Sequence, residues 1–251
     1  METAWFEDDR FWRQFGVAAF GAERWCQAAD ELPALMTLLG LTDRPGRVLD
    51  LCCGPGRHSI ALASAGVHVT AVDRNADYLS QLRTRAATTS LAIETVRADM
   101  REFVRPGAFD AALCIGLSFG YLERDDEDVT VLRNLRRSLA PGGRLVLDAP
   151  TPVWPRELEP WFLVKRPEFG ALVQVERSAG DASVVMRWSF QGVGADQEPS
   201  VFVQRLYTPE RLRDLFLLAG FGSVTVFGGF DRSRFDEHAR KAVVVGVAPG
   251  S

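Results

Sequence analysis

A glycine-rich turn that follows a short apolar run is the strongest chemical signal in this sequence. The run Val48-Leu-Asp-Leu-Cys52 leads through Cys-Gly-Pro-Gly into a stretch that is compatible with a helix. Gly54 and Gly56 can adopt left-handed backbone angles, and they let a ligand approach the main chain without a β-carbon in the way. The unpaired amides at the helix start favour a negative group, such as the carboxylate of an amino acid. The turn therefore predicts a ligand site, although nucleotide-dependent dehydrogenases use the same device.

Asp73 adds a second polar group, at the end of the next apolar run, residues 67–73. It follows the glycine turn at about the 20-residue spacing at which nucleotide-binding folds place a carboxylate on a ribose. Its two oxygens can accept hydrogen bonds from both ribose hydroxyls. A strand-end aspartate that caps the following helix explains the same residue equally well, so Asp73 alone does not separate a ligand role from a structural one.

A third position separates the classes of ligand. Asp99 and Met100 follow a third apolar run, residues 91–97. Asp99 can accept a hydrogen bond from the exocyclic amine of adenine, and Met100 can lie against the adenine ring. Arg74 can cover the other face of that ring with its planar guanidinium. Three successive strand ends then present a turn, a ribose ligand and an adenine ligand at the carboxyl edge, where open α/β sheets bind ligands.

Taken together, these segments resemble the class I S-adenosylmethionine (SAM)-dependent methyltransferases. The matching segments are Asp50-Leu-Cys-Cys-Gly-Pro-Gly56, Val72-Asp73, Ala98-Asp99-Met100, Phe109-Asp-Ala-Ala-Leu-Cys114 and Leu139-Ala-Pro-Gly-Gly-Arg-Leu-Val-Leu147. The resemblance is strong over residues 46–148, and the segment 207–221 is similar to the end of the same fold. It implies an α/β fold with a doubly wound, seven-stranded, mostly parallel sheet whose last strand is inserted antiparallel beside the sixth. It also implies SAM as the cofactor and S-adenosylhomocysteine as the product.

The resemblance assigns cofactor roles by position. The turn serves the methionine end, the aspartates at the next two strand ends serve ribose and adenine, and the backbone of residues 114–116 lies under the cofactor. The pair Arg57-His58 is similar to a pair found in many bacterial small-molecule members, and we expect it to reach the cofactor carboxylate. Cys52 departs from the family pattern, which has a glycine there and allows a closer approach to the backbone. The implied cofactor-binding residues are Asp50, Cys52, Gly54, Gly56, Arg57, His58, Asp73, Arg74, Asp99, Met100, Cys114, Ile115 and Gly116.

Methyl transfer from a sulfonium makes modest demands on catalytic side chains. It is an in-line displacement with a neutral leaving group, so alignment of donor and acceptor in a dry pocket can supply about 7–11 kcal/mol of barrier reduction. A general base helps only when the acceptor must lose a proton. The candidates are His58, Tyr121, Asp148 and His238. Each also has an explanation without catalysis. His58 can anchor the cofactor and Tyr121 can line the pocket, whereas Asp148 can end a strand and His238 can lie on the surface.

The elements that must position these residues alternate between strand and helix, which predicts a parallel sheet covered on both faces. Residues 5–40 are expected to be helical and rich in aromatic side chains. Three later runs alternate with the two-residue period of antiparallel strands and predict an insertion, at 171–177, 184–190 and 201–207. We expect one domain over residues 1–251, divided into an N-terminal helical cap (1–45), a SAM-binding core (46–148), a substrate-side antiparallel insertion (149–207) and a C-terminal helix with the last two strands (208–251).

The composition limits the partners. With 251 residues, a net charge of −4 and 47% hydrophobic residues, the chain is an ordinary globular protein without the positive field of a nucleic-acid binder. Its acidic start lacks the apolar core of a signal peptide, and no apolar run reaches membrane-spanning length. The four cysteines form no Cys-x-x-Cys pair, so we expect reduced thiols and no metal site. These features predict a cytoplasmic protein that contacts neither membrane nor nucleic acid, and they leave a homodimer open.

The methyl acceptor is expected between the N-terminal helices and the inserted strands. Aromatic side chains enrich the insertion and suit a small apolar or aromatic molecule, or a sugar stacked on a ring. They are Trp154, Trp161, Phe162, Trp188, Phe190 and Phe202. The sequence therefore favours methyl transfer to nitrogen or oxygen of a small molecule.

Three other readings compete with this function. A catalytically silent SAM-binding scaffold shares all the cofactor residues. An NAD-type oxidoreductase is weakened by the missing third glycine and by the Asp99-Met100 pair, which it leaves without a role. A nucleic-acid methyltransferase is disfavoured by charge and by the segment Cys114-Ile-Gly-Leu-Ser-Phe119, which replaces the catalytic loop of that class.

Overall fold

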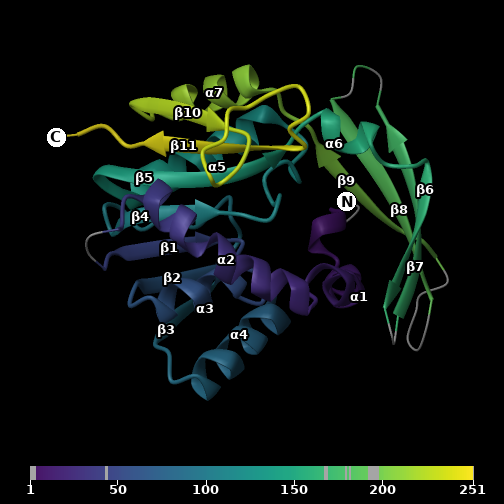
Figure 1. Cartoon of the computed structure of the whole chain (residues 1–251), viewed down its shortest axis with the longest axis horizontal. Coiled ribbons are helices and arrows are strands. Elements are labelled where there is room, and N and C mark those ends of the chain that lie inside the picture. Colours follow the sequence, from purple (N-terminus) through teal and green to yellow (C-terminus); the bar gives the residue numbers. More distant parts are fainter. Residues whose placement is uncertain are drawn as a thin grey trace.

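A computed structural model of the chain contains two sheets (Figure 1). It describes residues 4–42, 45–166, 169–178, 180, 182–191 and 198–250. The larger sheet has seven strands in the order β10-β11-β5-β4-β1-β2-β3. Their bounds are β1 Arg47–Leu51, β2 His68–Asp73, β3 Ile93–Arg97, β4 Phe109–Cys114, β5 Leu139–Pro150, β10 Ser223–Phe227 and β11 Lys241–Val247.

The predicted seven-stranded, mostly parallel sheet is confirmed. Strands β1 to β5 pair in parallel, whereas β11 lies between β5 and β10 and is antiparallel to both. The four strands β4, β1, β2 and β3 are therefore neighbours with their carboxyl ends at one edge. That edge is where an open α/β sheet binds its ligand.

Helices bury both faces of the larger sheet, which explains why its strands are apolar on both sides. Successive residues of β1 point to opposite faces: Val48 packs with α2, α3 and α4, and Leu49 packs with α5 and α7. Both side chains are fully buried. The helices are α2 Ala22–Leu39, α3 Arg57–Ser64, α4 Ala76–Thr88, α5 Asp125–Ser138 and α7 Pro209–Leu218.

The second sheet is an antiparallel meander of four strands inserted after β5. The predicted alternation is confirmed in β8, where Val184, Met186, Trp188 and Phe190 are buried and the residues between them are partly exposed. The first strand, β6, was not predicted from the sequence. The bounds are β6 Trp161–Arg166, β7 Phe169–Arg177, β8 Ser183–Gln191 and β9 Ser200–Arg205, preceded by the short helix α6 Val153–Arg156.

The N-terminal region is helical, as expected, but it is divided into three pieces. The short helix η1 (Trp5–Glu7) and α1 (Asp9–Ala19) precede α2, and Asp8 caps α1 by accepting from the Arg10 amide. Phe11 joins the apolar cluster of the second sheet. The ring centroids of Trp5 and Phe202 lie 4.6 Å apart. In Figure 1, η1 and α1 lie between the larger sheet and the second sheet. No helix in the described part of the chain is both long and apolar enough to cross a membrane.

A buried polar network joins the second sheet to the helices of the larger one. Arg205, at the end of β9, donates to Asp128 of α5 over 2.7 Å, and the Tyr207 hydroxyl donates to the same carboxylate over 2.6 Å. Burial raises the pKa of Asp128 to about 6, although Tyr207 and Arg205 act in the opposite direction. Each donor therefore compensates part of the cost of a carboxylate removed from water.

We expect Tyr207→Phe to lower the free energy of unfolding by about 1–3 kcal/mol, because it leaves a buried carboxylate with one donor fewer. Chemical denaturation monitored by circular dichroism measures the change. Arg124→Ala is the control: it removes an exposed pair with Asp126 and should change stability by less than about 0.5 kcal/mol. Equal effects of the two substitutions would contradict the role of the network.

Candidate functional site

The carboxyl ends of four strands open onto one cavity of about 650 Å³. Its wall includes Gly54 after β1, Asp73 at the end of β2, Asp99 after β3 and Gly116 after β4. The remaining wall comes from the N-terminal helices, from the second sheet and from the segment before β11. The structure thus brings the predicted turn and both predicted carboxylates to one place.

The turn after β1 is tied directly to the end of β2. Gly54 has φ 56°, and its amide donates to Asp73 Oδ2 over 2.8 Å. Cys52 also has a left-handed φ of 58°, a conformation that costs a residue with a β-carbon roughly 1–2 kcal/mol. This strain explains why a glycine occupies the same place in the family pattern.

Asp73 is arranged to receive further hydrogen bonds. One oxygen accepts from Gly54, and the other accepts from the Asn75 amide over 2.8 Å. A carboxylate oxygen has two lone-pair sites, so each oxygen can accept one bond more. Removal from water raises the pKa of Asp73 to about 6, although the two amides act in the opposite direction.

Asp99 is held by a residue that the sequence analysis missed. Arg101 donates to both Asp99 oxygens, over 2.9 and 2.7 Å, and also to Glu7 over 3.0 Å. Partial burial alone would raise the pKa of Asp99, but the hydrogen bonds and charge of Arg101 outweigh it and hold the pKa below its usual value. The spacing of Asp99 and Arg101 was visible in the sequence, whereas the contact of Arg101 with Glu7 depends on the tertiary fold.

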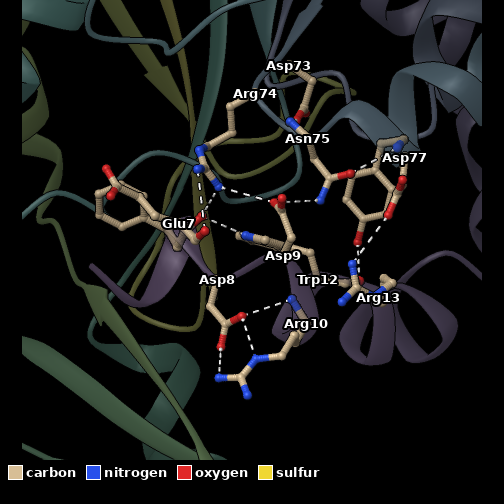
Figure 2. Close-up of polar contacts among 12 residues, drawn as sticks. Glu7, Asp8, Asp9, Arg10, Trp12, Arg13, Asp73, Arg74, Asn75 and Asp77 are labelled. Carbon is tan, nitrogen blue, oxygen red and sulfur yellow. Dashed lines mark hydrogen bonds and ion pairs between the residues drawn. The ribbon is translucent and has the colours of Figure 1, made fainter. Parts of the chain in front are cut away.

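Arg74 holds the N-terminal segment around Glu7 and Asp9 through polar contacts (Figure 2). Its guanidinium donates to the carbonyl oxygens of Phe6 and Glu7, over 2.8 and 3.4 Å, and lies 3.7 Å from the Asp9 carboxylate. Phe6 is buried and lines the cavity. Arg74 also lines the cavity. We call its contacts with Phe6, Glu7 and Asp9 the N-terminal latch, because they hold this segment against the end of β2.

The cavity wall near α2 and α3 carries both signs of charge. Arg57 is half-buried, and burial lowers the pKa of its guanidinium. Within the described residues it makes no protein hydrogen bond. Glu31 lies 3.5 Å from His58 Nε2 and accepts from Gln27. Burial would raise the pKa of Glu31, but the neighbouring His58, the charge of Lys241 and the hydrogen bond from Gln27 lower it, so the carboxylate stays ionised. A ligand with an amino-acid group carries a carboxylate and an ammonium group, which the Arg57 cation and the Glu31 anion could bind.

Three of the predicted cofactor residues do not line the cavity. Asp50 is buried behind the turn, and its carboxylate accepts from the Ser59 hydroxyl. Gly56 packs against α4, where a β-carbon would lie 2.3 Å from Leu82 Cδ1. The side chain of Cys114 is fully buried in the main core. These residues shape or support the wall without forming its surface.

The four candidate bases lie in different surroundings. His58 lines the cavity beside Glu31, whereas His238 has 81% of its side chain exposed and does not line it. Tyr121 lines the cavity, but burial raises the pKa of its phenol, which therefore stays protonated at neutral pH. Asp148 accepts from the Gly116 and Leu117 amides, both over 2.8 Å, and so holds the loop after β4. Because His238 is exposed and does not line the cavity, its position argues against the predicted catalytic role.

Four of the six aromatic residues proposed for the acceptor wall line the cavity, namely Trp154, Phe162, Trp188 and Phe202. The other two do not. Trp161 is 60% exposed, and Phe190 stacks on Trp188 with ring centroids 5.8 Å apart. No group of three or more His, Cys, Asp or Glu side chains among the described residues could hold a metal ion.

Comparison with known proteins agrees with this architecture. Residues 48–143 match a family model described as a methyltransferase domain. The chain is 28% identical over 180 residues to cypemycin N-terminal methyltransferase of a Streptomyces species, a match that covers 72% of this chain and 63% of that protein.

Two solved structures share the fold. The first is a SAM-dependent methyltransferase from Clostridium acetobutylicum, with a TM-score of 0.77 at 16% identity; the match covers 96% of this chain and 97% of that one. The second is SAM-bound CalS10, an amino pentose methyltransferase from Micromonospora echinaspora, with a TM-score of 0.68 at 21% identity; here the match covers 94% and 95%.

The N-terminal latch leads to a prediction about the local stability of the segment that contains Glu7 and Asp8. In Arg74→Ala, the amides of Glu7 and Asp8 should exchange with solvent roughly tenfold faster or more, because the hydrogen bonds from a charged donor to this segment are lost. Hydrogen exchange followed by NMR or mass spectrometry measures the rate. Arg83→Ala, which removes a contact of Arg83 with Thr95 away from the latch, should leave the rate unchanged. Unaltered exchange in Arg74→Ala would refute the latch.

Proposed function

We propose that this chain is a SAM-dependent methyltransferase, with SAM as its cofactor, and that it transfers a methyl group to a nitrogen or oxygen atom of a small molecule. One observation carries the proposal: Gly54, Asp73 and Asp99 meet at a single cavity at the carboxyl edge of the sheet. Their order matches the methionine, ribose and adenine parts of one SAM molecule.

We propose that the ribose and adenine bind at the ends of β2 and β3. The free lone pairs of Asp73 accept from the two ribose hydroxyls. Asp99, oriented by Arg101, accepts from the adenine amine. Met100 and Cys52, whose sulfur atoms lie 3.6 Å apart, form the soft apolar surface beside the ring.

We assign the methionine end of SAM to the cavity wall near α2 and α3, which carries charges of both signs. Arg57 is a half-buried cation without a protein hydrogen bond in the described part of the chain, which suits the cofactor carboxylate. Glu31, kept ionised beside His58, suits the ammonium group. The backbone of Ile115 and Gly116 lies beneath the cofactor, and Asp148 fixes this loop through its bonds to Gly116 and Leu117.

Catalysis then depends on alignment and exclusion of water. Bound SAM supplies an electrophilic methyl group, and the chain orients it with the contacts assigned above. The apolar wall from α1 and the second sheet keeps the reacting atoms dry. We assign no general base: Tyr121 stays protonated, and His58 lies beside Glu31 on the wall that we assign to the methionine end of the cofactor. A neutral amine reacts without a base, so nitrogen is the acceptor atom that this site favours.

Other properties remain proposals of the same kind. A cavity of about 650 Å³ and a net charge of −4 favour a small molecule over nucleic acid. The name of the Streptomyces relative, an N-terminal methyltransferase, agrees with a nitrogen acceptor. The cytoplasmic location and the homodimer stay predictions from the sequence alone.

Asp73→Ala should weaken binding of SAM and S-adenosylhomocysteine by about 100-fold or more, because two hydrogen bonds to a charged acceptor are lost. Calorimetry with both ligands and with NAD measures this. Asp77→Ala, which removes an exposed carboxylate of α4, is the matched control and should bind normally. Binding of NAD without any response to SAM would identify an oxidoreductase instead. Transfer of a labelled methyl group to a small-molecule library then separates an enzyme from a silent scaffold.

The raised pKa of Asp73 predicts that cofactor affinity depends on pH. The ribose hydroxyls bind the ionised carboxylate, so below a pKa of about 6 the protein must lose a proton in order to bind. The Kd for S-adenosylhomocysteine should rise about tenfold between pH 7 and pH 5. Calorimetry across this range tests the slope. Asp73→Asn should bind weakly with a flat profile, and a flat profile in the wild type would refute the assignment.

A further inference from the structure

The walls of the cavity divide it into two chemically different halves. Every charged side chain that lines it comes from α2, from the larger sheet with the loops and helix that follow its strands, or from the segment before β11. The lining residues of α1, of α6 with the turn after it, and of the second sheet carry no charge. Phe15, Phe162, Met186 and Phe202 belong to this uncharged half, which we call the acceptor chamber.

The acceptor chamber contains a buried hydrogen-bond donor without a partner. Trp188 is 6% exposed and lines the cavity, and within the described residues its indole Nε1 has no hydrogen-bond acceptor. Phe15 packs against its ring edge to face, with centroids 5.2 Å apart. The indole nitrogen can only donate, and leaving such a donor buried and unpaired is costly. A ligand oxygen in the chamber would remove that cost.

A second buried polar side chain of the chamber already has a partner. Gln204 is 1% exposed, and its amide donates to the carbonyl oxygen of Phe119 over 2.8 Å. Among the described residues, no charged side chain from α1, α6 or the second sheet lines the cavity, so a charged ligand group buried against this wall would find no counter-charge on it, and an unpaired buried charge is strongly unfavourable. Flat aromatic walls instead suit a ring.

From these contacts we infer the class of the methyl acceptor, an inference that rests on the function proposed above. The acceptor has an uncharged, ring-shaped body that lies in the acceptor chamber against Phe15 and Phe202. An oxygen atom of this body accepts a hydrogen bond from Trp188 Nε1. The nitrogen or oxygen atom to be methylated faces the charged half, where the SAM methyl group is delivered.

Three probes of similar size test the inference: acetophenone, ethylbenzene and benzoate. They are titrated into the full chain saturated with S-adenosylhomocysteine and labelled with ¹⁵N in the indole groups of its six tryptophans. Trp188→Phe identifies the Trp188 resonance by its disappearance. If that variant does not fold, phenylalanine replacements of the other five tryptophans identify it instead. Trp161→Phe is the matched control, because Trp161 is exposed and outside the cavity.

We expect acetophenone to move the Trp188 indole proton downfield and ethylbenzene to bind without that shift. In Trp188→Phe, acetophenone should bind roughly 2- to 10-fold more weakly, with ethylbenzene unchanged and Trp161→Phe like the wild type. Tighter binding of benzoate than of acetophenone would overturn the uncharged chamber. An unmoved Trp188 resonance, or unchanged acetophenone affinity in Trp188→Phe, would overturn the role of the indole.

The two proposals fail separately. Loss of S-adenosylhomocysteine binding would refute the methyltransferase function, and the same probe titrations without that ligand would still report on the acceptor chamber. Normal, Asp73-dependent binding of S-adenosylhomocysteine without any acetophenone effect at Trp188 would refute only the acceptor class.

Discussion

The hydrogen bond between the Gly54 amide and the Asp73 carboxylate is the contact on which the site depends. It joins the turn after β1 to the end of the neighbouring strand β2, and it can form only because these two strands are parallel and adjacent. The same carboxylate takes a second amide at Asn75 and still has a lone pair on each oxygen. The Asp73 side chain therefore holds the turn after β1 in place and remains able to bind a ligand.

The acidity of Asp73 also depends on its position in the cavity wall. Removal from water raises its pKa to about 6, and the two backbone donors recover part of that cost. Asp99 represents the opposite case, because the guanidinium of Arg101 more than offsets its burial and lowers its pKa. Two carboxylates on neighbouring strand ends thus differ in acidity through their partners.

The division of the cavity follows the organisation of the chain. The larger sheet, with its loops and helices, provides the charged groups, whereas α1 and the inserted sheet provide an uncharged wall. Arg74 holds the N-terminal segment against the first half, and the network around Asp128 fixes β9 to α5. A cofactor with several charges and an uncharged acceptor can therefore bind side by side, each facing surroundings of its own chemistry.

The sequence by itself determined the alternation of strands and helices, the antiparallel insertion and the placing of the glycine turn, Asp73 and Asp99 at successive strand ends, because hydrophobic period and turn chemistry are local signals. The seven-stranded sheet was implied by the resemblance of the motifs to a known family. Tertiary structure decided the rest. Nothing local showed that Asp50, Gly56 and Cys114 lie behind the cavity surface, or that His238 is exposed and does not line the cavity. The bond from Arg74 to the backbone of Phe6 was equally hidden. Glu31, Arg101 and the unpaired indole of Trp188 acquire their meaning only from residues distant in sequence. Strand ends can be read along the chain, but a side chain's partners depend on which elements pack against it.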